Sequence, residues 1–469
     1  MSFQTRSLLL SLALTGCAVG PDYRRPAAES PPAFRELPGE WKQAQPRDEI
    51  ARGKWWEIFG DAQLNRLVEQ IDVSNQTLRN AEAQYRQAQA ATAIARAAFF
   101  PTLEFDASVT RNRSPAGLSG GLTAGQILTQ RSGAFNASWA PDFWGAVRRS
   151  VESARASEQA SAATLASARL LLQSQLATSY FQLRVLDVQR VLLEDTVAAY
   201  QKSLDLTQNR YQAGVAARVD VVQAETQLKS TQAQMLDLGV QRAQLEHAIA
   251  MLIGKAPGEF TIAPVPKFVA AMPPIPTGLP SELLERRPDV ASAERSAAAA
   301  NAQIGVAKAA FFPAVTLTGS LGSRTLAASQ WFTAPSRFWS VGPALAQTVF
   351  DAGLRRAKTE QAIAAYDASV ATYRQAVLTA FQQVEDSLAA IRILEEEANV
   401  QDDAVQAARQ SVELTVNQYK AGTVSYLNVV TVQATQLANE RTAVGLLGLR
   451  LSASVALVQA LGGGWKAAD

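Results

Sequence analysis

Two segments of this chain repeat each other about 210 residues apart. The sequence AAFFP at 97–101 recurs at 309–313, and NRYQAG at 209–214 recurs as NQYKAG at 417–422. In each copy a strand-like hairpin is followed by a long helical pattern. An internal duplication on this scale determines the architecture before any single residue does. The fold must therefore use two copies of a rod joined to a hairpin.

Each rod carries mostly apolar residues in alternating steps of three and four. The steps run back from Tyr211 in the first copy and from Tyr419 in the second, and no proline interrupts 145–214 or 353–422. A repeat of 3.5 residues kept over this length predicts a coiled-coil seam, which makes neighbouring helices supercoil. At 1.5 Å per residue each rod is expected to be roughly 100 Å long, and a globular enzyme has little use for such a helix.

Glycine ends both rods. After Gly214 and Gly422 a second helical pattern begins, and it runs to about Gly254 in the first copy and about Gly462 in the second. Glycine just after a helix is a common stop signal, since it accepts the left-handed backbone. Each copy is therefore expected to form an antiparallel helical hairpin, with tight turns near 214–220 and 422–428.

The segments before the rods alternate apolar and polar residues, as β-strands do. The expected strand hairpins lie within 102–141 and 314–350, and their aromatic residues include Phe105, Phe135, Trp139 and Trp339. One interpretation is a half-buried sheet in a soluble sandwich. The other is a membrane β-barrel, whose lipid-exposed strands must pair all their backbone hydrogen bonds. Four strands cannot close a barrel alone, so in that case several chains must share one.

The N-terminus looks like a bacterial lipoprotein signal. Arg6 precedes a short apolar stretch, too short to span a bilayer as a helix, which ends at Gly16-Cys17. In such a signal, cleavage before the cysteine is coupled to acylation, so Cys17 is the expected lipid attachment site. Ala18, rather than aspartate, follows the cysteine, as in signals sorted to the outer membrane. A secretory signal that merely contains a cysteine is the alternative.

The composition argues against several classes of function. The net charge is +2 with no long basic run, so nucleic acid is not an expected partner. Cys17 and His247 are the only cysteine and histidine. We therefore expect no disulfide framework, no cofactor and no metal site, and we interpret His247 as a surface or seam residue. No transmembrane helix is expected after the signal.

Three further segments carry a family resemblance. They are GCAVGPDYRRP at 16–26, WWEIFGD at 55–61, and LPSELLERRPDV at 279–290, which leads through GVAKA at 305–309 to the second FFP. Together they resemble the outer-membrane factor lipoproteins of tripartite efflux pumps, the NodT-type branch of the TolC-like superfamily. The resemblance covers nearly the whole mature chain.

The resemblance implies a mainly α fold with membrane β-strands. In this family, three chains each contribute four strands to one twelve-stranded barrel, which continues into a tunnel of antiparallel coiled-coil helices across the periplasm. The expected organisation is a signal peptide (1–16), an acylated wrapping segment (17–60), a first repeat (61–256), a Pro-rich linker (257–280), a second repeat (281–462) and a C-terminal tail (463–469).

The function implied is that of an exit duct, without bond chemistry, for small molecules leaving across the bacterial outer membrane. The implied partners are two further copies of the chain, outer-membrane lipid, a periplasmic adaptor, and an inner-membrane transporter of the resistance–nodulation–division (RND) type. A duct for an ABC-type exporter and a periplasmic coiled-coil scaffold lipoprotein without a pore are the alternatives. An enzyme is not expected, because no nucleophile or metal set is recognisable.

The resemblance also implies a gate at the turns of Gly214 and Gly422. Family members close the tunnel there and meet the adaptor. By motif position, Asp220 and Tyr419 match an aspartate and a tyrosine that link neighbouring coiled coils in closed members. Because Tyr419 continues the heptad seam, simple packing is the alternative role.

The chain departs from the family pattern beside this gate. Some members place acidic rings facing the lumen, where this chain has Asn428 and Thr431, and Val424 stands at a position that is often basic. A ring of aspartates that favours cations is therefore not expected, and the constriction is expected to be mainly steric and polar.

Overall fold

The computed structural model describes residues 18–28, 34–36, 54–113, 126–268, 272 and 286–463. The expected signal peptide, Cys17, and much of the wrapping segment, the Pro-rich linker and the C-terminal tail lie outside these residues. The chain divides into two compact units. Unit 1 comprises Met1–Ala27, Gln84–Ser161 and Ser292–Tyr373, and unit 2 comprises Ala28–Ala83, Ala162–Ala291 and Arg374–Asp469. Each unit thus contains segments of both sequence repeats.

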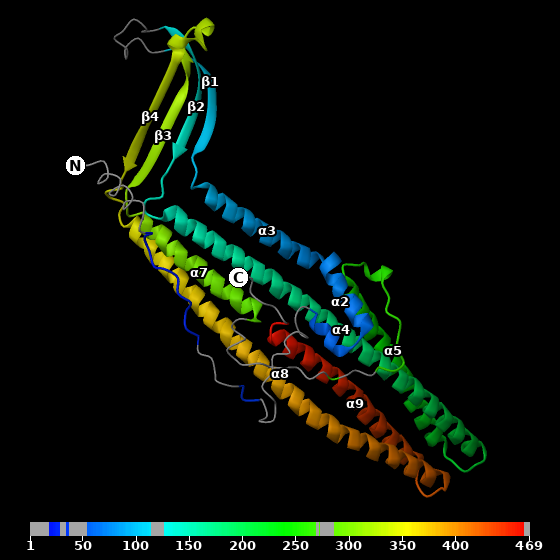
Figure 1. Cartoon of the computed structure of the whole chain (residues 1–469). Coiled ribbons are helices and arrows are strands. Elements are labelled where there is room, and N and C mark those ends of the chain that lie inside the picture. Colours follow the sequence, from blue (N-terminus) through cyan, green and yellow to red (C-terminus); the bar gives the residue numbers. More distant parts are fainter. Residues whose placement is uncertain are drawn as a thin grey trace. The chain divides into compact units, whose positions relative to one another are not determined.

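Both repeats form a helical hairpin with the same helix lengths (Figure 1). Helices α4 (Ala146–Gln212) and α8 (Leu354–Lys420) have 67 residues each, and α5 (Arg218–Leu252) and α9 (Tyr426–Ala460) have 35 each. Every position of the two predicted seams in α4 and α8 is buried or half-buried, except Arg190 and Tyr211. The prediction of paired long heptad helices is confirmed.

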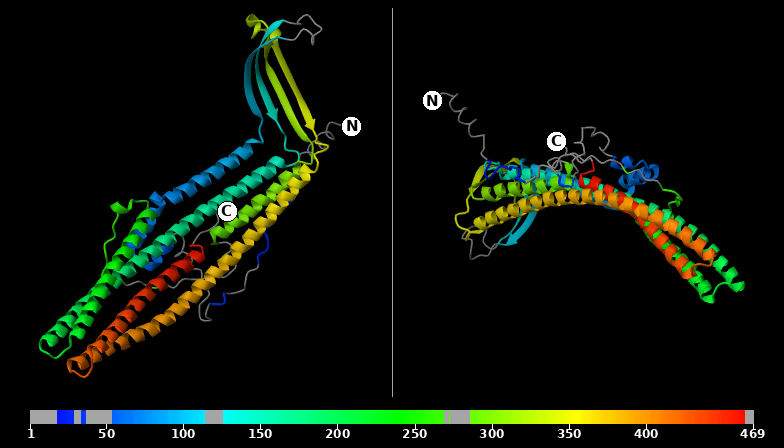
Figure 2. Two further views of the ribbon diagram at one scale, coloured as in Figure 1. Left: turned by 180° about the vertical axis from the view of Figure 1, so that it is seen from behind. Right: turned by 90° about the horizontal axis from the view of Figure 1, so that it is seen from below.

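The two hairpins lie side by side within unit 2 (Figure 2). Leu193 of α4, Leu238 of α5 and Leu437 of α9 form one buried cluster between them. Leucine at seam positions removes apolar surface from water, and this burial is the main favourable term for such helices.

Helix α9 is, among the described helices, the one that is long and apolar enough to cross a membrane by length and composition. Its second half is nevertheless packed inside unit 2, where Leu451, Val455 and Leu457 are almost fully buried. A buried core helix passes the same test, so we interpret α9 as part of the helical core.

The short helix η1 (Trp55–Phe59) and helix α2 (Ala62–Ser74) pack against the first hairpin in unit 2. Asp61 caps α2, because its Oδ1 accepts the backbone N–H groups of Gln63 at 2.8 Å and Leu64 at 3.0 Å. Its Oδ2 accepts the hydroxyl of Tyr180 from α4 at 2.7 Å. One carboxylate thus starts α2 and ties it to the coiled coil.

A buried ionic cluster joins α4, α5 and the start of the inter-repeat linker in unit 2. Asp187 accepts hydrogen bonds from Arg184 at 2.8 Å and from Arg242 at 2.8 Å. Arg184 also donates to the carbonyl of Ala263, and Asp187 accepts the N–H of Val265 at 3.2 Å. The short helix η2 (Pro257–Glu259) precedes this segment. Charge-assisted hydrogen bonds therefore hold the first residues of the linker against the first repeat.

Unit 1 contains a four-stranded antiparallel sheet. Its strands stand in sequence order and are β1 (Thr102–Arg113), β2 (Ile127–Trp139), β3 (Ala314–Thr325) and β4 (Arg337–Ala346). Helix α3 (Gln76–Ala97) precedes β1 and α7 (Pro288–Ala309) precedes β3, and the short helices η4 (Ala328–Gln330) and η5 (Ala334–Ser336) connect β3 to β4. Both predicted strand hairpins are confirmed, and β2 pairs with β3 to join them.

The register of the sheet separates two faces. Phe105 lies opposite Phe135, Phe135 opposite Leu321, and Leu321 opposite Trp339, so these four form one row on one face. Each is more than half exposed within the chain. The other face carries polar residues such as Asp106, whose carboxylate accepts the amide of Asn136 at 2.7 Å. Odd-numbered strand residues thus form an apolar face, and even-numbered ones a largely polar face.

Candidate functional site

The predicted turns are built in the same way in both repeats. Gly214 has φ +75° and Gly422 has φ +77°, the left-handed region that favours glycine. The N–H of Gly214 donates to the carbonyl of Tyr211 at 2.9 Å, and that of Gly422 to the carbonyl of Tyr419 at 3.0 Å. The next N–H in each turn bonds one residue further back, which completes a Schellman-type helix end.

Tyr419 lies in a buried apolar cluster beside these turns. Its side chain is 5 % exposed, and its ring meets that of Tyr426 edge-on at 5.3 Å. The cluster joins α4, α5, α8 and α9 of unit 2, and its other buried members are Tyr200, Leu204, Ala224, Leu228 and Val429. Packing is therefore one role of Tyr419, as its heptad position indicated.

The hydroxyl of Tyr419 has no hydrogen-bond partner among the described residues, although it is buried. An unpaired buried hydroxyl costs free energy, and this one has a hydrogen bond still to donate. The equivalent residue of the first repeat, Tyr211, is 43 % exposed. The two copies of one motif therefore place their tyrosines differently.

Arg210 connects the two hairpins beside these turns. It is not among the site residues predicted from the sequence. Its guanidinium carbon lies 4.8 Å from the ring centre of Tyr419, and its Nη1 donates to the carbonyl of Lys420 at 3.2 Å. A cation held over a tyrosine face is attracted by the ring. The only signal in the sequence is that the second repeat has Gln418 at this motif position, so the arginine is specific to the first copy.

Asp220 caps its own helix in the structure. Its Oδ2 accepts the N–H of Ala217 at 3.2 Å at the start of α5. It makes no hydrogen bond to Tyr419 within one chain, since that hydroxyl is unpaired. Burial raises the pKa of the Tyr426 hydroxyl, and the nearby charge of Asp220 adds to this effect. The Tyr426 hydroxyl therefore stays protonated at physiological pH and donates to Ser203 at 3.2 Å.

Asn428 and Thr431 lie on the exposed side of α9, three residues apart and so on one face of the helix. The hydroxyl of Thr431 donates to the carbonyl of Leu427 at 2.9 Å, which partly satisfies it within the helix. Val424, in the turn, packs against the tyrosine cluster. The two exposed positions, Asn428 and Thr431, are thus polar and uncharged.

The segment that follows the predicted acylation site is held firmly in unit 1. Cys17 itself lies outside the described residues. Arg149 of α4, which is 5 % exposed, donates to Asp22 at 2.7 Å and to Glu152 at 2.8 Å. The hydroxyl of Tyr23 donates to Glu294 at 2.6 Å.

Glycine allows this segment to come close to the helices. A Cβ on Gly20 would stand 2.5 Å from the Cα of Gly305, and one on Gly305 would stand 2.7 Å from Cγ of Arg149. Real Cβ atoms do not come that close, so any side chain at Gly305 would push the segment away. The sequence GVAKA therefore has a structural reason for its glycine.

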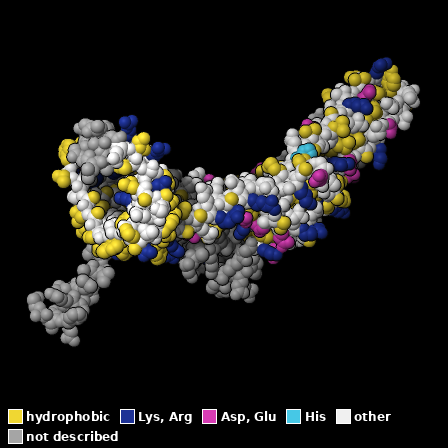
Figure 3. All heavy atoms as spheres, turned by 90° about the horizontal axis from the view of Figure 1, so that it is seen from above, with side chains coloured by type: hydrophobic (Ala, Val, Ile, Leu, Met, Phe, Trp, Pro, Cys, Tyr) yellow, Lys and Arg dark blue, Asp and Glu magenta, His cyan; other side chains and the backbone are white. Residues whose placement is uncertain are grey.

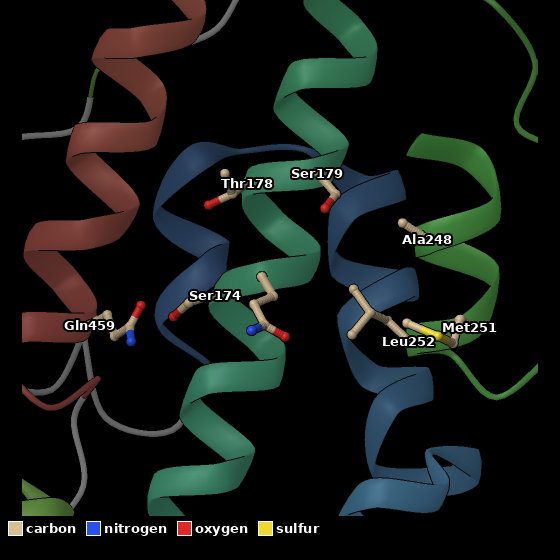
Figure 4. Close-up of a pocket in the computed structure, with 8 residues that line it drawn as sticks. Ser174, Thr178, Ser179, Ala248, Met251, Leu252 and Gln459 are labelled. Carbon is tan, nitrogen blue, oxygen red and sulfur yellow. The ribbon is translucent and has the colours of Figure 1, made fainter. Parts of the chain in front are cut away.

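A groove of about 330 Å³ lies among α4, α5 and α9 in unit 2 (Figure 4). It is lined by Ser174, Gln175, Thr178, Ser179, Ala248, Met251, Leu252 and Gln459. No lining side chain is an acid, a base or a thiol. His247 is exposed on α5, and no group of three or more potential metal ligands occurs among the described residues.

Comparison with known proteins identifies the class. A family model described as Outer membrane efflux protein matches residues 67–255 and 279–463. The pyoverdine export outer membrane protein OpmQ of Pseudomonas aeruginosa is 34 % identical over 435 residues, which are 92 % of this chain and 91 % of OpmQ. The toluene efflux pump outer membrane protein TtgC of Pseudomonas putida is 32 % identical over 464 residues, 97 % of this chain and 96 % of TtgC.

The solved structure of the outer-membrane channel OprN is similar to this chain with a TM-score of 0.89 and 31 % identity, covering 96 % of this chain and 100 % of OprN. Long paired helices joined to a four-stranded sheet with an apolar face are thus the fold of the TolC-like channels. The chain belongs to the outer membrane efflux protein family. It is an outer membrane protein, and its relatives are efflux channels.

Proposed function

We propose that this chain forms a trimeric outer membrane channel that serves as the exit duct of a tripartite efflux pump. The observation that carries the proposal is the open sheet of unit 1. In the described residues β1 and β4 each pair on one side only, while one face of the sheet is apolar and exposed. A lipid-facing sheet must close to satisfy its edges, and three copies of four strands reach the size of known barrels.

The duct is proposed to be anchored by acyl chains on Cys17. The clamp of Arg149 on Asp22 supports this role, because it holds the segment just after the anchor against the helices of unit 1. Several acyl chains on one residue give stable membrane attachment. Cys17→Ser should abolish acylation, and a variant that still carried lipid by mass spectrometry would contradict the proposal.

The turns at Gly214 and Gly422 are proposed to dock a periplasmic adaptor that works with an RND-type transporter. Val215 and Val219 are exposed beside the first turn, which fits contact with another protein. A photo-crosslinker at Val219, with Leu236 further along α5 as the control position, should capture the adaptor. Capture of an ABC-type exporter complex instead would favour a duct for that class of exporter. Capture of no partner would argue against docking at this turn.

Tyr419 and Asp220 are proposed to hold the tunnel closed by a hydrogen bond between neighbouring chains. The unpaired hydroxyl of Tyr419 supports this role. Tyr419→Phe combined with Asp220→Ala should raise the leak conductance of the protein in planar bilayers, because each lost bond is worth about 1.5–3 kcal/mol when shielded from water. Tyr211→Phe is the matched control, since that exposed tyrosine occupies the same motif position. If the conductance equals that of the control, packing is the only role of Tyr419 and the gating role is rejected.

Electron microscopy of the full-length protein, purified from outer membranes in detergent, tests the duct directly. End-on class averages should show threefold symmetry around a lumen. Solid or monomeric particles without a lumen would contradict the channel and favour a scaffold lipoprotein.

A further inference from the structure

The apolar face of the sheet changes character toward its hairpin turns. Odd-numbered residues of all four strands share this face. Beyond the row that contains Phe135 and Leu321, the same face carries Arg111 and Arg113 on β1, Arg131 on β2 and Arg337 on β4. We call Arg111, Arg131 and Arg337 the arginine face. Arg111 and Arg337 are exposed, and Arg131 is half-buried.

No carboxylate balances the arginine face. The only charged residues of 107–141 and 314–350 are arginines. They are Arg111, Arg113, Arg131, Arg324 and Arg337. In the part of the chain that the structure describes, none of the three guanidinium groups forms an ion pair, and Arg131 donates only to the carbonyl of Leu326 at 3.3 Å. The acidic strand residues, Glu104 and Asp106, have even numbers and lie on the other face. The positive charge of the arginine face can therefore bind an anion from outside the chain.

Blue Lys and Arg side chains are visible among yellow hydrophobic ones around the sheet of unit 1 (Figure 3). Such a mixture fits a surface that meets both acyl chains and charged headgroups. A purely aqueous rim would not need the apolar row beside it.

The β3–β4 connection marks where the apolar surface ends. The indole Nε1 of Trp331 lies 3.9 Å from the point where a Cβ on Gly133 would stand, so the ring covers the odd-numbered face. Phe332 stacks on it at 5.2 Å and is exposed. The indole N–H has no partner among the described residues. A tryptophan ring on an apolar surface with its N–H unpaired is typical of the membrane–water interface.

The arginine face begins at the level of this tryptophan. Gly133 pairs with Ser323 and Ser323 with Arg337, so Arg337 stands in the row that Trp331 covers. Arg131 and Arg111 stand one and two rows further toward the turns. The arginines would therefore meet the headgroup layer while the apolar row below them meets acyl chains.

We propose that the arginine face binds the phosphate groups of phosphorylated glycolipids in the outer leaflet and so holds the sheet at a set depth. The inference rests on the proposed function, which puts this face against lipid. Guanidinium groups bind phosphate oxygens in pairs. Each basic group near an anionic membrane surface strengthens binding about fivefold. A lipid fits better than free phosphate, because its acyl chains would cover the adjacent apolar row.

The test uses the full-length protein in detergent and native mass spectrometry with added diphosphoryl lipid A. The combined variant Arg111→Gln, Arg131→Gln and Arg337→Gln should bind this lipid at least tenfold more weakly than the natural chain. Arg324→Gln is the matched control, because Arg324 lies on the opposite face with its guanidinium 5.1 Å from the Phe338 ring centre. The triple lysine variant keeps the charge but loses paired bonding, so a loss of only a few fold is expected.

Three outcomes would overturn the proposal. They are equal binding by the triple glutamine variant, equal binding of lipid A whose phosphates have been removed, and full displacement of the lipid by millimolar inorganic phosphate. Conductance of the same preparations reports separately on the duct. A natural chain that binds lipid A through these arginines but conducts no ions would contradict the channel and leave the lipid site standing.

Discussion

We expect Asp187→Ala to destabilise unit 2 by about 3–5 kcal/mol. Asp187 is 2 % exposed and is the shared acceptor of Arg184 and Arg242, so its removal leaves two guanidinium groups without their common counter-charge. The N–H of Val265 also loses its acceptor, which loosens the linker. Thermal unfolding of the detergent-solubilised protein, followed by tryptophan fluorescence, measures the change.

Glu360→Gln is the matched control for this prediction. Glu360 pairs with Arg356 at 3.1 Å on α8, but the two side chains are 66 % and 84 % exposed. Exposed pairs contribute about 0–1 kcal/mol, because water and salt screen them. If Asp187→Ala unfolds at the same temperature as Glu360→Gln, the buried cluster adds no net stability, and the linker is held by its apolar contacts.

Leu321→Arg should lower the free energy of unfolding of the protein in the membrane by about 1–2 kcal/mol, because a lipid-facing charge one row from the headgroup layer costs less than the roughly 2–4 kcal/mol of one at the bilayer centre. Leu321 is 62 % exposed in the row of Phe135 and Trp339. Urea titration of the protein refolded in liposomes measures the loss. The change places a charge where the proposed barrel meets acyl chains.

Ser320→Arg is the control, one residue away on the opposite face of β3. In a barrel this side chain points into the lumen, where an arginine meets water and costs little. Equally small losses for the two variants would show that neither face of the sheet lies in lipid. That result would argue against the duct and for a scaffold.

Much of the fold was predictable because it depends on local patterns. The proline-free stretch 353–422 predicted a rod that the structure bounds at Leu354–Lys420. A heptad pattern between two glycines leaves few other structures for such a segment. The alternation of period two likewise predicted β1, since Leu103, Phe105 and Val109 all lie on one face.

The candidate gate was only partly predictable. Asp220 and Tyr419 could be named from the motif, but the sequence does not say that Asp220 caps its own helix. Arg210 was missed because its contact with Tyr419 joins two helices more than 200 residues apart. Such contacts depend on how the hairpins pack, which no local pattern encodes.

Local patterns in the sequence specify the helices and strands of this protein: the duplication, the heptads, the glycine stops and the strand alternation. How each copy uses the same motif depends instead on tertiary packing. Tyr211 and Tyr419 stand at one position of one repeat, yet the first is exposed and the second is buried. The physical reason is packing: Tyr426 and Arg210 surround Tyr419, and burial depends on neighbours brought together from distant parts of the chain.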